Sequence, residues 1–217
     1  MQSCLAFDTA GRVCSVAVFK GGRVFVEQSD PGLNGHAVCL VPMIQKVLHK
    51  ANLTCDEISI IAVPRGPGSF TGIRVSIATA QGLILATKAK AFTPTSLEVY
   101  AYTALQAKPH CQKILVLLDN KRSGFYSQIF DEKMTPLSKG EILSVEQAWD
   151  LLQKDPKLSF VSDVMLPEMD QDRMILLDSS VAEATLAYWQ TQPPQLQGET
   201  VLRPFYLHNP QFSKCRD

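Results

Sequence analysis

The hydrophobic pattern of the first sixty residues predicts three strands, a helix and a further strand. The first strands are CLAFD, RVCSVAVF and RVFVEQ, and they are separated by glycine-containing turns, as in an antiparallel meander. Residues 36–51 carry apolar side chains at helical spacing, although Pro42 within them favours a kink or a later helix start. The run ISIIAV at 58–63 predicts a short strand buried on both faces.

A second helix is predicted from Ser69 to about Thr87, with Ser69 or Thr71 available as its N-cap. This helix carries a stripe of small residues at four-residue steps, formed by Ala78, Gly82 and Ala86. Small side chains let two helix backbones approach closely, so the stripe favours packing against a neighbour. Further helices are expected near 145–153 and 181–192.

The segment KILVLLDNKRSGFYSQIF repeats the design of the opening of the chain. In both places an apolar strand ends in an aspartate, a turn with a glycine follows, and a second strand begins. The two aspartates are Asp8 and Asp119, 111 positions apart. The likeness is of pattern rather than of identity, so it indicates an internal duplication without establishing one.

Composition and charge exclude several classes of protein. Lys and Arg together number 21, and Asp and Glu together also number 21. The chain therefore lacks the surplus of basic residues that a stand-alone nucleic-acid binder usually carries. The six cysteines form no CxxC pair, and the four histidines never lie three or four residues apart. A local zinc-binding motif is therefore not expected. No apolar run reaches about 18 uninterrupted residues and no signal-peptide pattern opens the chain. We therefore expect a cytoplasmic protein without membrane contact.

The glycine-rich turn VPRGPGSFTGIRV is the strongest local signal. It contains Gly66, Gly68 and Gly72 where a strand passes into a helix, and such a turn can present backbone N–H groups to an anion. Equally, the glycines can serve only tight backbone geometry and close packing. A P-loop is excluded because Ile73 and Arg74 follow Gly72, and the spacing GxGxxxG departs from the dinucleotide-binding fingerprint.

Asp8 and Thr9 follow the first strand and could bind a phosphate-bound cation and a phosphate in a cleft between two halves. The residues alone favour the simpler interpretation, in which Asp8 starts a turn. A hydrolase triad of Ser69, His36 and a carboxylate lacks support, because no GxSxG elbow surrounds Ser69.

Three segments, AFDTAGRVCSVAV, NGHAVCLVPMI and GPGSFTGIRVSIATAQGL, resemble the TsaB (YeaZ) family of bacterial proteins for threonylcarbamoyladenosine synthesis on tRNA. The resemblance implies an α/β fold of the actin-like and sugar-kinase-like ATPase type, with two ribonuclease-H-like halves and mixed sheets. This agrees with the duplicated aspartate-turn pattern. We expect residues 1–105 to form the first half and residues 106–217 a smaller, degenerate second half.

The resemblance also implies a function. Members of the family partner TsaD, a paralogue that transfers threonylcarbamoyl to the adenosine beside the anticodon, together with the ATPase TsaE, so contact with tRNA is expected to be indirect. This chain would be a non-catalytic scaffold or activator that binds no cofactor alone, with ATP and magnesium entering in the assembled complex. The alternative is an enzyme of the same superfamily, either a nucleotide-binding hydrolase or a glycoprotease.

Two sets of site residues follow from these expectations. The second half has no glycine pair for an adenosine-cradling loop, so the phosphate site is expected to be vestigial; it comprises Asp8, Thr9, Gly66, Gly68, Ser69, Thr71 and Gly72. The first predicted helix is apolar on more than one side and the second carries the small-residue stripe, which predicts a helix-on-helix interface with TsaD, or with a second copy when the chain is isolated. The predicted interface residues are His36, Leu40, Met43, Ile44, Val47, Ala78, Gly82 and Ala86. In the alternative, the stripe packs against its own sheet.

Overall fold

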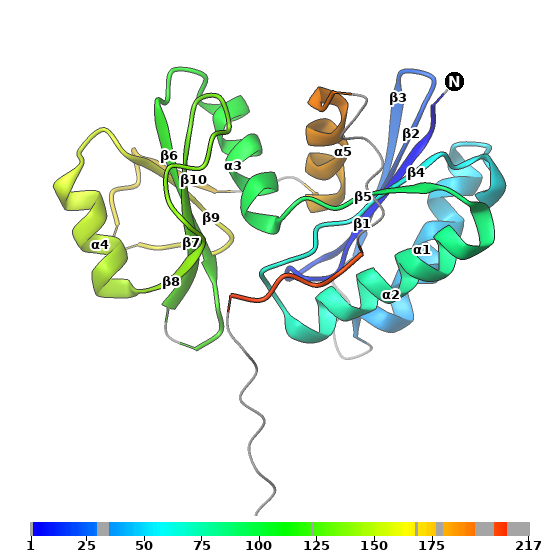
Figure 1. The fold of residues 1–217 in the computed structure, drawn as a ribbon, viewed down its shortest axis with the longest axis horizontal. Coiled ribbons are helices and arrows are strands. Elements are labelled where there is room, and N and C mark those ends of the chain that lie inside the picture. Colours follow the sequence, from blue (N-terminus) through cyan, green and yellow to red (C-terminus); the bar gives the residue numbers. More distant parts are fainter. Residues whose placement is uncertain are drawn as a thin grey trace, which may run out of the picture.

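A computed structural model of the chain describes residues 2–29, 35–122, 124–167, 169–176, 180–193 and 202–207. The chain forms two halves side by side, each built on one five-stranded mixed sheet (Figure 1). The first sheet has the order β3-β2-β1-β4-β5, in which β1 pairs antiparallel with β2 and parallel with β4. Its strands are β1 (Cys4–Asp8), β2 (Cys14–Lys20), β3 (Arg23–Ser29), β4 (Ile60–Ala62) and β5 (Lys90–Phe92).

The second sheet repeats this arrangement strand for strand. Its order is β10-β9-β6-β7-β8, in which β6 pairs antiparallel with β7 and parallel with β9. Its strands are β6 (Lys113–Asp119), β7 (Gly124–Asp131), β8 (Glu141–Ser144), β9 (Ser159–Ser162) and β10 (Met174–Leu176). The predicted fold class, two ribonuclease-H-like halves with mixed sheets, is confirmed, and the duplication that the aspartate-turn pattern indicated is present in the topology.

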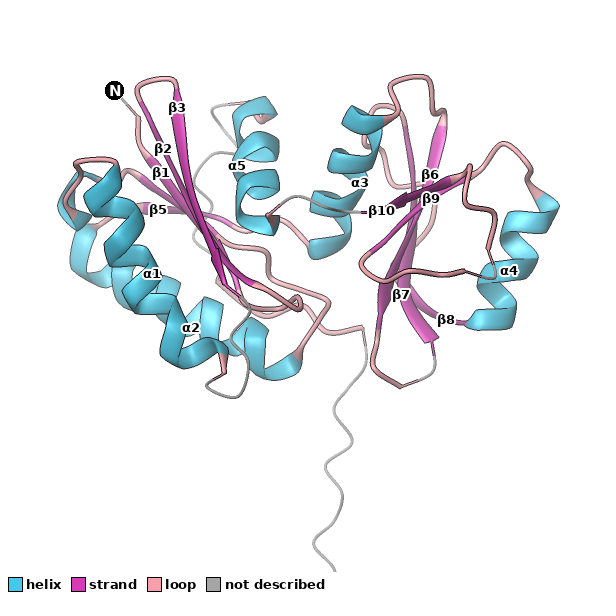
Figure 2. Ribbon diagram, turned by 180° about the vertical axis from the view of Figure 1, so that it is seen from behind, coloured by secondary structure: helices cyan, strands magenta, loops and turns pink. Residues whose placement is uncertain are grey.

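Helices cover both faces of the first sheet (Figure 2). α1 (His36–Lys50) and α2 (Phe70–Thr87) pack with Leu5 and Phe7 on one face of β1, and α5 (Val181–Thr191) packs with Cys4 and Ala6 on the other. The alternation of these residues along β1 is the period-two pattern of a strand buried on both sides. A short 3-10 helix (Cys55–Glu57) precedes β4.

The second half is covered in the same way. α3 (Ser96–Ala107) lies between the two sheets and packs on β6, whereas α4 (Val145–Lys154) covers the outer face (Figures 1 and 2). α5 lies late in the chain yet completes the first half, where the Ala182 N–H donates to Ser15 Oγ at 3.1 Å. The division of the chain at residue 105 stays a prediction.

α1 covers the predicted range to within one residue. It begins at His36, so of the two effects expected of Pro42 the later start is not found, and Pro42 lies exposed inside the helix. Ser69, not Thr71, caps α2: Ser69 Oγ accepts the Gly72 N–H at 3.2 Å.

Candidate functional site

The carboxyl end of β1 places Asp8 at the border between the halves. Asp8 is only 1% exposed, and its two carboxylate oxygens accept the N–H groups of Ala10 and Gly11, each at 3.1 Å. Burial raises the pKa of Asp8 to about 6, against the lowering effect of these hydrogen bonds. Asp8 therefore holds its own turn, which is the simpler of the two interpretations that the sequence allowed.

The Thr9 side chain contacts α2 and is not part of the cavity lining. Its side chain is fully buried, and Oγ1 donates to the Gly72 carbonyl at 2.6 Å and shares a hydrogen bond with Ser76 Oγ at 2.7 Å. The hydroxyl points into α2 and makes its hydrogen bonds there, which agrees with a site that no longer binds a phosphate; the assignment of Thr9 to a vestigial site stays a prediction.

The glycines of the turn mainly permit close packing. A Cβ on Gly72 would lie 1.8 Å from the Thr9 carbonyl oxygen, and one on Gly68 would lie 3.1 Å from the Ala10 Cβ. Gly66 has a φ of +104°, in the region that favours glycine. The Ser69 N–H, which an anion would need, donates to the Ala10 carbonyl at 3.1 Å. The packing of α2 onto the turn after β1 thus explains why glycine occupies positions 66 and 72, without a bound ligand. Thr71 lies exposed on the first turn of α2.

A cavity of about 880 Å³ lies between the halves. The first half contributes Asp8, Gly68 and Ser69 to its lining, and the second half contributes Asp119 and Asp163 from the ends of β6 and β9. Of the predicted vestigial site, the structure therefore brings these three first-half residues to one cleft and leaves Thr9 and Gly72 inside the fold.

The acidic side chains of the second half of the cleft accept hydrogen bonds from neighbouring groups. The Asp119 carboxylate accepts the N–H and the ammonium group of Lys121, the latter at 2.7 Å. Burial raises the pKa of Asp119, but the Lys121 hydrogen bonds and charge outweigh it, so the pKa lies below its ordinary value. Asp163 accepts the Asp119 N–H at 2.8 Å, and burial raises its pKa. A phosphate entering here would face these carboxylates as well as Arg12 and Lys121, which also line the cavity.

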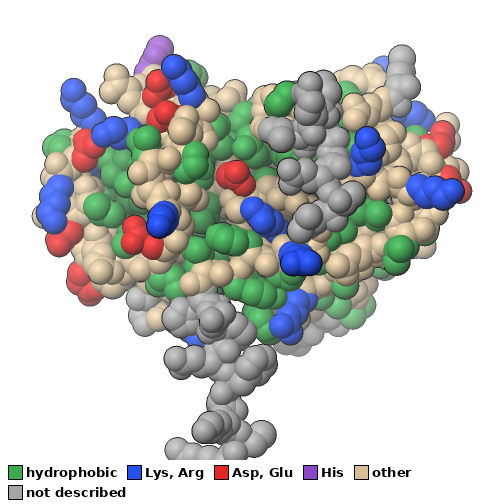
Figure 3. All heavy atoms as spheres, viewed as in Figure 1, with side chains coloured by type: hydrophobic (Ala, Val, Ile, Leu, Met, Phe, Trp, Pro, Cys, Tyr) green, Lys and Arg blue, Asp and Glu red, His purple; other side chains and the backbone are tan. Residues whose placement is uncertain are grey.

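The described parts of the chain contain no group of three or more His, Cys, Asp or Glu side chains that could hold a metal ion. Figure 3 shows acidic and basic side chains interspersed over this face of both halves. The cavity lining likewise combines three aspartates with Arg12, Lys121 and Arg122, so the cleft is electrically mixed, unlike the strongly basic grooves that track nucleic-acid backbones.

The outer sides of α1 and α2 expose an apolar surface. The most exposed large apolar side chains of the two helices are Leu85, 85% exposed, Val38, 65% exposed, and Val41, 50% exposed. We call the set Val38, Val41, Ala78, Gly82, Leu85 and Ala86 the α1–α2 surface. A Cβ on Gly82 would meet nothing within 4 Å, so the small-residue stripe faces outward and does not pack on its own sheet.

Four of the eight predicted interface residues lie in the core and not on the α1–α2 surface. Leu40, Met43, Ile44 and Val47 are buried in the core that α1 shares with the first sheet, so the prediction that they contact a partner is wrong. They occupy the inner side of α1, and Val38 and Val41 occupy the outer side. The sequence did contain a signal for this division, since 40, 43, 44, 47 and 48 follow one helical stripe and 38 and 41 fall outside it. His36 is half-buried at the first turn of α1.

Comparisons with known proteins agree with this architecture. A family model described as "TsaD: tRNA N6-adenosine threonylcarbamoyltransferase" matches residues 33–170. The tRNA threonylcarbamoyladenosine biosynthesis protein TsaB of Buchnera aphidicola subsp. Baizongia pistaciae is 32% identical over 152 residues, which cover 68% of each chain. TsaB of Escherichia coli is 29% identical over 220 residues, covering 89% of this chain and 94% of that protein. Among solved structures, YeaZ from Pseudomonas aeruginosa superposes with a TM-score of 0.70 at 24% identity, over 95% of this chain and 100% of that one.

Proposed function

The chain belongs to the TsaB family and acts in tRNA threonylcarbamoyladenosine biosynthesis, and we propose that it does so as a non-catalytic subunit that docks on a TsaD-type partner through the α1–α2 surface. The observation that carries this proposal is the outward small-residue stripe of α2, together with the exposed Leu85 on the same helix and the exposed valines of α1.

Such a surface is unfavourable in water. α2 is, among the described residues, long and apolar enough to cross a membrane by length and composition alone, yet only 28% of it is buried. Its inner side, with Gly72, Ile73 and Ala80, belongs to the core, so the outer side is what another molecule would cover. Burying the Leu85 side chain alone would contribute about 2 kcal/mol. Ala78, Gly82 and Ala86 would let a partner helix approach α2 closely.

A TsaD-type protein is the proposed occupant because the TsaB relatives and the TsaD family model, which this chain resembles, are both named for the same tRNA modification. In the isolated chain, a second copy would cover the surface instead. We propose that ATP and magnesium enter with TsaD-type and TsaE-type subunits, in the cytoplasm, and that tRNA is reached through the partner. The engaged Thr9 hydroxyl and Ser69 N–H support this division, since two groups of a phosphate site are unavailable here.

A hydrolase or glycoprotease activity finds less support in the geometry. The Ser69 hydroxyl caps α2 and the Asp8 carboxylate is bound within its own turn. Asp8→Ala should therefore leave tRNA modification by the reconstituted complex largely intact. A loss greater than about a hundredfold, or about 2.7 kcal/mol in transition-state free energy, would contradict the non-catalytic role.

Co-purification with a TsaD-type protein from the same organism, followed by an assay of tRNA modification, tests the docking proposal. Gly82→Glu should leave the circular dichroism melting curve intact, because a side chain at Gly82 projects into open space. It should abolish partner binding by placing an unpaired carboxylate in an apolar interface. Gln153→Glu, an exposed change on α4, is the control that should bind normally. A folded Gly82→Glu variant with wild-type affinity would refute the proposed surface.

A further inference from the structure

Residues 202–207 cross from one half of the molecule to the other, beside the cavity between them. Figure 1 shows this segment in red, between the second sheet and α2. We call residues 202–207 the strap. Three of its side chains, those of Phe205, Tyr206 and Leu207, line the cavity.

Three hydrogen bonds hold the strap to the first half. The Phe205 N–H donates to the Arg65 carbonyl at 2.7 Å, and Gln81 Nε2 donates to the Leu202 carbonyl at 3.3 Å. Arg74 Nε donates to the Tyr206 hydroxyl at 3.2 Å. The strap is therefore bound along α2 and at the segment just before it.

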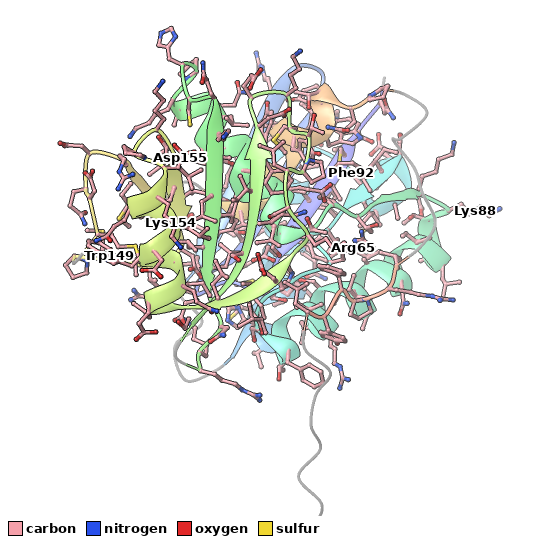
Figure 4. The ribbon with its side chains drawn as sticks, turned by 60° about the vertical axis from the view of Figure 1, so that its left-hand side comes forward. Arg65, Lys88, Phe92, Trp149, Lys154 and Asp155 are labelled. Atoms are coloured by element: carbon pink, nitrogen blue, oxygen red, sulfur yellow. The ribbon has the colours of Figure 1, made fainter. Side chains whose placement is uncertain are left out.

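Aromatic stacking adds to this attachment. The Arg74 guanidinium lies 3.7 Å from the centroid of the Phe70 ring, and the rings of Phe70 and Tyr206 have centroids 5.3 Å apart. Arg65, labelled in Figure 4, has its guanidinium 5.4 Å from the centroid of the Phe205 ring. Such cation–π contacts fix the planes of both partners.

The strap also lies against the backbone of the glycine-rich turn. A Cβ on Gly66 would be 2.7 Å from the Phe205 carbonyl oxygen, so only glycine fits under the strap. Leu202 and Tyr206 pack against the core of the first half. The first half thus holds the strap through both backbone and side-chain contacts.

Attachment to the second half is of a different kind. Leu207 packs against a cluster that contains Leu97 and the β6 residue Val116. A Cβ on Gly140 would lie 3.1 Å from Leu207 Cδ2, so the leucine sits directly over the loop before β8. Among the described residues, the contacts of the strap with the second half are apolar and centre on Leu207, whereas those with the first half are hydrogen-bonded and stacked.

We propose that the strap is a latch, fixed to the first half and releasable from the second, that closes one side of the cavity, while the packing of α3 against α5 joins the halves elsewhere. Among the described residues, Leu207 holds the strap to the second half by apolar contact, which is non-directional, so this side chain can detach without leaving a buried polar group unpaired. Opening of the cleft then requires Leu207 to detach while Phe205 and Tyr206 stay on α2. The same segment would connect the α1–α2 surface mechanically to the second half.

Hydrogen–deuterium exchange on the full-length chain tests the latch. Leu207→Ala and Leu207→Asp should speed amide exchange about tenfold or more in the cleft segments 96–100, 118–122 and 138–143, because the halves separate more often. Exchange in the central strands β1 and β6 should stay as in the wild type. The control is Arg203→Ala, an exposed strap position, which should change none of these rates.

Tyr206→Phe provides the complementary arm, since it removes the hydroxyl that Arg74 binds and keeps the ring. It should loosen the strap on the first half less than Leu207→Ala loosens the cleft, because stacking and two backbone-carbonyl hydrogen bonds remain. Unchanged exchange in the cleft segments of a folded Leu207→Ala variant would overturn the latch. Equal acceleration across both halves and their central strands would overturn it too, because Leu207 would then stabilise the whole chain rather than couple its halves.

Discussion

The Thr9 hydroxyl donates a hydrogen bond to the Gly72 carbonyl oxygen at 2.6 Å, and a Cβ on Gly72 would lie 1.8 Å from the Thr9 carbonyl oxygen. The turn after β1 and the first turn of α2 are thus joined both by a hydrogen bond and by direct backbone contact. Two residues that resemble phosphate-binding elements in the sequence instead hold the first half together.

Thr9→Val should destabilise the chain by about 1–3 kcal/mol. The change keeps the volume of the side chain but leaves the Gly72 carbonyl and the Ser76 hydroxyl without this partner in a buried place. Urea unfolding measures the loss, and Thr9→Ser, which keeps the hydroxyl, is the control. If Thr9→Val is as stable as Thr9→Ser, the hydrogen bond contributes nothing.

Gly72→Ala and Gly82→Ala should have opposite effects, although both place the same methyl group on α2. At Gly72 the methyl would collide with the Thr9 backbone and cost about 3 kcal/mol or more, whereas at Gly82 it meets nothing within 4 Å. Alanine is favoured over glycine inside a helix by up to about 1 kcal/mol, so Gly82→Ala should raise the melting temperature. Thermal unfolding of the two variants side by side provides the comparison, and a stable Gly72→Ala chain would contradict the close contact.

Asp8 should make the chain less stable as the pH rises through 6. Its pKa is about 6 in the folded chain, whereas its ordinary value is 3.8, so between these values the folded state holds a proton that the unfolded state has lost. The contribution of Asp8 is therefore fully present below pH 3.8 and is lost as the pH rises through 6, amounting to about 3 kcal/mol. The free energy of unfolding, measured from pH 4 to 7, should fall relative to that of Asp8→Asn. Parallel curves for the two proteins would show that Asp8 does not titrate in this range.

The sequence predicts most of the fold because the signals for it are local. Leu5 and Phe7 alternate with Cys4 and Ala6, which is the pattern of a strand covered on both faces, and the Asp8 turn recurs at Asp119 where the topology repeats. These patterns depend only on neighbours within one strand or turn.

What the sequence does not predict depends on long-range packing. The Thr9–Gly72 hydrogen bond spans 63 positions and the Arg74–Tyr206 hydrogen bond spans 132, and no spacing rule relates residues so far apart. The strap therefore has no local signal beyond its aromatic composition. The two sides of α1 are a different case, because a local signal existed: Leu40 lies on the helical stripe that continues at 43, 44, 47 and 48, whereas Val41 lies outside it.

Adjacent residues of α1 should consequently respond differently to the same charge. Val41→Lys places an ammonium group on the 50% exposed outer side, so stability should change by no more than about 0.5 kcal/mol. Affinity for a TsaD-type partner should nevertheless fall at least about tenfold, because the charge would be desolvated in the interface. Leu40→Lys would bury the same charge in the core and should unfold the chain. Circular dichroism melting and a binding titration on both variants decide between the two sides of the helix. Wild-type affinity in Val41→Lys would remove α1 from the interface, and a folded Leu40→Lys variant that fails to bind would restore the inner side as the partner surface.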